Sequence, residues 1–256
     1  MAELNIDLHP AQLEIFHSDK RFKIVAAGRR FGKSYLSAWI LLIKAIQSES
    51  KDVFYIAPTF QQAKDIMWAM LKDLGRDLIV QAYENTAVLT LINGRKIYLK
   101  GSDRPETLRG VGLSYVVLDE YASMKPVVWE QIIRPTLADV RGGALFIGTP
   151  AGKNHFFDLY KDALEDDDWD AFQFTSRDNP FLPPEEIQAS RKSMSSMAFR
   201  QEFEASFETN SGGIFKEDWF QVGEEPEEGN YVIAVDPAGY EAVEQERNLK
   251  RSRLDE

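Results

Sequence analysis

The sequence of 256 residues contains no cysteine and only three histidines. Without cysteine, the chain has no disulfide scaffold, no thiolate metal site and no cysteine nucleophile. The histidines are His9, His17 and His155, far apart in the sequence, which excludes a histidine-rich metal centre. No apolar run approaches the 18 residues that a membrane-spanning helix needs. The first ten residues lack the basic-then-apolar pattern of a secretion signal, so we expect the protein to stay in the cytoplasm where it is made.

Hydrophobic residues make up 44% of the chain and aromatic residues 12%, which is enough for a packed core and excludes disorder of the whole chain. The net charge of −11 is uneven, because residues 161–170 carry −5 and residues 223–256 carry −6. The remainder is therefore neutral. Residues 20–34 contain six bases and no acid, so a local site for a polyanion is compatible with the acidic total.

Apolar strand patterns alternate with helical spacings over residues 21–176. The expected strands cover residues 22–27, 53–57, 115–118, 144–147 and 171–175, and the expected helices cover residues 34–47, 61–74, 127–140 and 155–164. This order predicts an α/β fold with a mostly parallel sheet flanked by helices. Asn93-Gly94 between residues 86–92 and 96–100 predicts a type I′ hairpin, inserted in the sheet or at its edge.

The pattern changes after residue 176. Asn179-Pro180 and Pro183-Pro184 end regular structure, and residues 185–207 then have helical character. A further strand at 231–235 ends at Asp236, and only about twenty mostly charged residues follow it. We therefore expect a first domain over residues 1–177, a small helical linker subdomain over 178–213, and only the start of another domain over 214–256.

Residues 27–34, Ala-Gly-Arg-Arg-Phe-Gly-Lys-Ser, follow a strand and open a helix, which is the context of a phosphate-binding P-loop. Backbone N–H groups and the helix N-terminus face the anion, and Lys33 is expected to reach the terminal phosphates. Ser34 is a candidate Mg²⁺ ligand. Ala27 stands where the motif has its first glycine. The predicted nucleotide-binding residues of this loop are Gly28, Arg29, Arg30, Phe31, Gly32, Lys33 and Ser34.

The two arginines of the loop carry charge toward the same anion. A guanidinium from Arg30 or Arg29 would stabilise the γ-phosphate during transfer. The alternative is a salt bridge on the outer side of the loop.

A second motif is the apolar run that ends in Asp119 and Glu120. An aspartate at the carboxyl end of such a strand holds Mg²⁺ through water in many nucleotide hydrolases, and Glu120 is placed to accept a proton from attacking water. Two acids at a strand end also serve as a helix cap. Their combination with the P-loop favours hydrolysis of a nucleotide over phosphoryl transfer to another substrate.

From residue 8 to about residue 237 these motifs resemble the large terminase subunit of tailed bacteriophages, the motor that packages DNA. The resemblance implies that Gln12 binds adenine, that Thr149 couples hydrolysis to movement, and that Arg109 acts as an arginine finger on a neighbouring subunit. It also implies that Asp236 is the first metal-binding aspartate of an RNase H-like nuclease domain. Its partner carboxylates are missing here, so we expect no nuclease activity.

The same resemblance implies a RecA-like P-loop ATPase with ATP and Mg²⁺ as its nucleotide and metal. The implied partners are double-stranded DNA, the portal protein and the terminase small subunit, in the host cell cytoplasm and without a membrane. The chain would assemble into a ring on the procapsid and be monomeric when isolated. Two alternatives remain at this point: a helicase-type DNA motor, which needs a second RecA-like lobe, and a nucleotide-gated assembly module that barely hydrolyses ATP.

Overall fold

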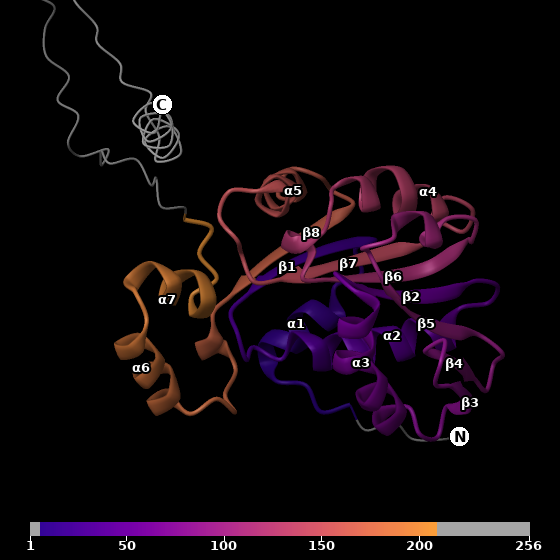
Figure 1. The fold of residues 1–256 in the computed structure, drawn as a ribbon, viewed down its shortest axis with the longest axis horizontal. Coiled ribbons are helices and arrows are strands. Elements are labelled where there is room, and N and C mark those ends of the chain that lie inside the picture. The colour runs from indigo at the N-terminus through magenta and orange to yellow at the C-terminus, as the bar shows by residue number, and fades with distance from the viewer. Residues whose placement is uncertain (1–5, 209–256) are drawn as a thin grey trace, which may run out of the picture. The chain divides into compact units, whose positions relative to one another are not determined.

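The computed structural model describes residues 6–208, which form one sheet domain with a pair of helices beside it (Figure 1). The sheet has eight strands in the order β3-β4-β5-β2-β6-β7-β1-β8. The strands are β1 (Phe22–Ala27), β2 (Asp52–Ala57), β3 (Ile79–Tyr83), β4 (Val88–Leu91), β5 (Lys96–Gly101), β6 (Leu113–Asp119), β7 (Gly143–Gly148) and β8 (Trp169–Phe174). In this sheet order, every neighbouring pair from β5 through β2, β6, β7 and β1 to β8 is parallel. The strands β3 and β4 add an antiparallel edge beside β5.

Helices cover both faces of this sheet, and alternate strand residues supply the two cores. On one face lie α1 (Pro10–His17), α2 (Lys33–Gln47) and α3 (Phe60–Leu74); on the other lie α4 (Arg134–Thr136) and α5 (His155–Ala163) (Figure 1). Successive strand side chains point to opposite faces, so Val25 packs with the first group and Ile24 with the second. The prediction of a mostly parallel α/β sheet is confirmed. No helix in the described residues is both long and apolar enough for a membrane span.

The predicted hairpin exists, but its predicted turn type is wrong. Gly94 has φ +80°, whereas Asn93 is not among the residues with positive φ, and a type I′ turn requires positive φ at both. The Gly94 N–H donates to the Leu91 carbonyl at 2.8 Å, which describes a type I turn followed by a left-handed glycine. The sequence also missed β3, which pairs with β4 outside this hairpin, so the antiparallel element lies at the sheet edge.

The helix expected over residues 127–140 is shorter and irregular. A π-helical segment covers Val128–Ile133, α4 ends at Thr136, and turns follow. Pro135 explains part of this result, because it has no N–H for an i−4 hydrogen bond and its ring displaces the preceding turn.

The linker region contains α6 (Pro184–Ser193) and α7 (Ser196–Phe203), joined to β8 by the short 3₁₀ turn Ser176–Asp178. After α7 the chain returns to the sheet domain, where Phe207 is buried with its ring 5.2 Å from that of Phe157 on α5. The linker helices are therefore anchored to the sheet domain at both ends.

Candidate functional site

The loop between β1 and α2 lies at the carboxyl edge of the parallel strands. Its two glycines, Gly28 and Gly32, occupy positions where neighbouring atoms leave no room for a side chain. A Cβ on Gly28 would lie 2.6 Å from both the Phe203 carbonyl oxygen and Ser176 Oγ. Gly32 has φ +98°, and a Cβ there would lie 2.5 Å from Gln12 Nε2. The linker therefore approaches the loop closely at Gly28, one residue after the position where the common motif has its first glycine.

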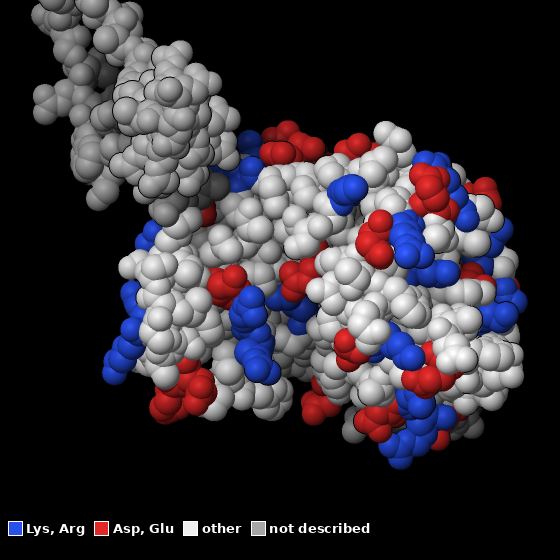
Figure 2. Space-filling model, viewed as in Figure 1, with Lys and Arg blue, Asp and Glu red and all other residues white. Residues whose placement is uncertain are grey.

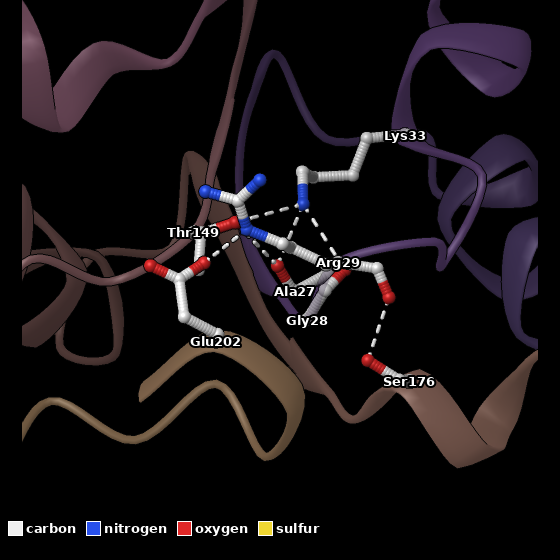
Figure 3. A network of polar contacts seen from close by, with 7 residues as sticks. All are labelled: Ala27, Gly28, Arg29, Lys33, Thr149, Ser176 and Glu202. Atoms are coloured by element: carbon white, nitrogen blue, oxygen red, sulfur yellow. Dashed lines mark hydrogen bonds and ion pairs between the residues drawn. The ribbon is translucent and has the colours of Figure 1, made fainter. Parts of the chain in front are cut away.

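The predicted phosphate-binding lysine lies at the base of this loop. Lys33 Nζ donates to the carbonyl oxygens of Ala27 at 2.7 Å and Gly28 at 3.1 Å, and to Thr149 Oγ1 at 3.1 Å (Figure 3). Burial lowers the pKa of Lys33, while the carboxylates of Glu120 and Asp119 oppose this shift. The structure thus brings Thr149, the coupling residue that the resemblance implied, into direct contact with the P-loop lysine.

The two acids lie where β6 ends. Asp119 is buried, with Oδ1 accepting the Glu120 N–H at 2.9 Å and Oδ2 accepting the Tyr55 hydroxyl. Burial raises the pKa of Asp119 to about 6, although the hydrogen bond from Tyr55 acts in the opposite direction. Glu120 adopts φ +53°, a left-handed backbone that non-glycine residues rarely occupy. This turn takes Glu120 out of the strand and into the adjoining cleft.

That cleft has a volume of about 620 Å³, and its lining includes Arg30, Lys33, Ser34, Glu120 and Thr149. Figure 2 shows charged side chains of both signs around the recess between the linker helices and the sheet domain. A hydroxyl at the start of α2 and a carboxylate at the end of β6 are oxygen donors of the kind that Mg²⁺ prefers. Ser34 and Asp119 therefore fit the predicted magnesium ligands chemically.

The linker contacts the P-loop through polar groups that the sequence did not identify. The Arg29 guanidinium forms an ion pair with the Glu202 carboxylate of α7 (Figure 3). Ser176 Oγ donates to the Arg29 carbonyl at 2.6 Å, and Asn179 Nδ2 donates to the Arg30 carbonyl at 2.7 Å. The sequence marks Asn179-Pro180 only as a breaker of regular structure. No sequence pattern points to Glu202.

A smaller cavity of about 270 Å³ adjoins the cleft and shares Phe31, Gly32 and Tyr35 with it. Gln12, the predicted adenine-binding residue, lines this cavity, but its amide is engaged: Nε2 donates to the Gly32 carbonyl at 2.9 Å, and Oε1 accepts the His9 N–H at 3.1 Å. These contacts favour a bracing role for Gln12 on the P-loop.

Arg109, the predicted arginine finger, lies away from this cleft. Its side chain is 48% exposed, pairs with Glu106 at 2.8 Å, and does not line the cleft. It follows β5 and a 3₁₀ turn, so it stands near the surface of the same domain. Asp236, the predicted nuclease ligand, lies outside the described residues.

Comparison with known sequences gives a family match over most of the chain. The family model described as the N-terminal part of the terminase large subunit, T4likevirus type, matches residues 24–222. The terminase large subunit of Escherichia phage T5 is 30% identical over 227 residues, which is 84% of this chain and 51% of the phage T5 protein. The chain thus spans about half the length of the curated relatives it matches.

Solved structures agree on the fold. The large terminase ATPase domain of Thermus phage P74-26 is similar at a TM-score of 0.68 and 26% identity, with 78% of this chain and 94% of that domain covered. The large terminase of another thermophilic bacteriophage, solved in complex with ADP, has a TM-score of 0.70 at 18% identity over 79% of this chain and 54% of its own. The second likeness shows the fold alone.

Proposed function

The chain belongs to the terminase large subunit family, and from this premise we propose that its described domain hydrolyses ATP to move double-stranded DNA into a procapsid. The observation that carries the proposal is the cleft that gathers Lys33, Ser34, Glu120 and Thr149 at the carboxyl ends of parallel strands. A nuclease role is not proposed for residues 6–208, and the family match does not support the helicase-type alternative.

In the proposed reaction, Lys33 Nζ exchanges its backbone carbonyl partners for the terminal phosphate oxygens of ATP. Ser34 and Asp119 would hold Mg²⁺, which neutralises charge on the phosphates. Glu120 accepts a proton from the water that attacks the γ-phosphorus. The new P–O bond forms as the bond between the γ-phosphorus and the β–γ bridging oxygen breaks, leaving ADP and inorganic phosphate.

The same contacts offer a route from chemistry to movement. Lys33 binds Thr149, and the neighbouring Arg29 binds Glu202 of the linker. A phosphate that draws these cations toward itself would weaken their present contacts, so nucleotide binding and linker position are linked. We further propose that copies of this chain assemble into a ring on the procapsid. The portal protein and the terminase small subunit are further proposed partners, and the host cytoplasm is the proposed location.

The adjoining cavity is the proposed base site. Phe181 from the linker, 72% exposed, and Tyr35 from α2 both line it and offer aromatic faces to a purine. Gln12 would act there by holding Gly32, and with it the start of α2, in place.

Glu120→Gln tests the chemical assignment. The variant should bind ATP with wild-type affinity and hydrolyse it about 10²–10⁴-fold more slowly, because only the general base is lost. Lys33→Ala is the matched comparison and should lose nucleotide binding as well. Phosphate release and fluorescent-nucleotide binding are measured with and without double-stranded DNA. Normal turnover by Glu120→Gln would refute the role of Glu120.

The role of Arg109 requires a test across subunits. In a neighbour's site, an arginine finger is worth about 10³–10⁵ in rate. Arg109→Ala and Glu120→Gln should each be inactive in the assembled state, yet a mixture should recover part of the activity, since some interfaces join an intact base to an intact finger. Arg109→Ala at wild-type speed in assembled rings would make Arg30 the better candidate.

A further inference from the structure

We propose that Tyr55 is a positioning residue for hydrolysis, which fixes the Asp119 carboxylate in the orientation that its Mg²⁺ role requires. The proposal rests on the proposed function, since it assigns a task to Tyr55 within that site. Tyr55 belongs to neither predicted motif: it lies on β2, more than sixty residues before Asp119.

The sheet brings the two residues together. Strands β2 and β6 are parallel neighbours, and Tyr55 pairs in register with Val117. Asp119 follows two residues later on β6, so it shares a face with Val117. The fully buried Tyr55 side chain extends along that face, and its hydroxyl donates to Asp119 Oδ2.

Both carboxylate oxygens of Asp119 therefore have a fixed donor. The Tyr55 hydroxyl binds Oδ2, and the Glu120 N–H binds Oδ1 at 2.9 Å. Two donors on the two oxygens prevent rotation of the carboxylate about its last torsion. An ionised carboxylate has about four acceptor positions, so each oxygen keeps a free lone pair for water bound to a metal ion.

Packing alone does not account for the hydroxyl. Phenylalanine would fill the same space among the apolar neighbours of β2, and a buried hydroxyl costs free energy unless it is hydrogen-bonded. Within residues 6–208, the one hydrogen bond found for this hydroxyl is with the acid at the strand end. Groups that orient a metal-binding carboxylate typically change metal affinity or activity by about 10–100-fold when removed.

The matched control is Tyr115→Phe. Tyr115 is also a buried tyrosine of the same sheet, on β6, but its hydroxyl has no hydrogen-bond partner among the described residues. Both substitutions remove one oxygen from a buried ring, and only Tyr55→Phe removes a donor from Asp119.

We expect Tyr55→Phe to raise the Mg²⁺ concentration for half-maximal ATP hydrolysis about tenfold and to lower kcat about tenfold, with KM for ATP changed less than about twofold. Mn²⁺ titrated into the protein with a non-hydrolysable ATP analogue, followed by electron paramagnetic resonance, should bind about tenfold more weakly. Tyr115→Phe should match wild type in every measurement. The Mn²⁺ titration reports only folded protein, so it decides the question even where Tyr55→Phe lowers the yield.

Wild-type Mg²⁺ and Mn²⁺ dependence in Tyr55→Phe, with an active wild-type protein, would overturn the positioning role and leave the proposed function intact. Equal losses in Tyr55→Phe and Tyr115→Phe would also overturn it, because they would indicate a packing effect. A wild-type protein that does not hydrolyse ATP would instead contradict the proposed function.

Discussion

Replacing Asp119 by asparagine should remove a pH-dependent cost from the stability of the metal-free protein while abolishing hydrolysis. Asp119 is 3% exposed, and burial raises its pKa from the usual 3.8 to about 6. About two pKa units at about 1.4 kcal/mol each give a cost of about 3 kcal/mol for keeping the carboxylate ionised in the fold. Asparagine removes this cost because it carries no charge.

Asparagine keeps one hydrogen bond of the site and reverses the other. The asparagine oxygen can accept the Glu120 N–H, and its amide can donate to the Tyr55 oxygen, which turns from donor to acceptor. The Tyr55 hydroxyl hydrogen then loses the acceptor that it has in the wild type, at a cost of about 1–3 kcal/mol that does not depend on pH, so the effect of the lost charge is the part of the stability change that varies with pH.

The dependence on pH identifies the cause. For an acid with a raised folded pKa, the folded state binds more protons than the unfolded state between about pH 4 and pH 6. The free energy of unfolding of the wild type therefore falls as pH rises through this window. The stability of Asp119→Asn relative to the wild type should therefore rise by about 2 kcal/mol between pH 4.5 and pH 8.

Urea unfolding followed by circular dichroism, in EDTA at both pH values, measures this difference. Asp73→Asn is the control, because it removes a carboxylate from the exposed surface, where Asp73 pairs with Arg76. A stability difference between Asp119→Asn and the wild type that does not change with pH would show that burial of the Asp119 charge is not the cause.

Two further outcomes follow from the described side chains. Burial lowers the pKa of Lys23 from 10.5 to about 8, so the unfolded state binds more protons than the folded state between pH 8 and pH 10.5. The free energy of unfolding of the wild type should therefore rise across this window by about 3 kcal/mol. Lys23→Met should flatten this rise in urea titrations, and an unchanged slope would contradict the prediction. Phe181→Ala should raise KM for ATP about tenfold with kcat nearly unchanged, since an aromatic stack on a base is worth about 1–3 kcal/mol. Phe181→Trp should retain the wild-type KM. An equal KM in the wild type and both variants would show that Phe181 does not belong to the base site.

Local sequence was sufficient for the elements that carry their own signal. The strand before Gly28, the helix that begins at Lys33 and the two acids at the end of β6 follow from apolar runs, glycine and charge within a few residues. The sequence-based predictions were less accurate where the backbone conformation depended on contacts with other parts of the chain. Asn93-Gly94 predicted a type I′ turn, but Asn93 does not adopt the positive φ that this turn requires. In the segment around Pro135, helical spacing did not reveal where the helix would end.

The sequence by itself determined most of the alternation of strands and helices, though not β3, together with the P-loop and the acidic pair, because hydrophobic periodicity and backbone freedom act between near neighbours in the chain. Only the tertiary structure decided which distant side chains meet: Tyr55 with Asp119, Glu202 with Arg29, and Gln12 with the Gly32 carbonyl of the P-loop. Such contacts depend on strand register and on how the linker returns to the sheet. When the packing of separate elements creates a pair, the residues next to one partner in the sequence do not reveal the other partner.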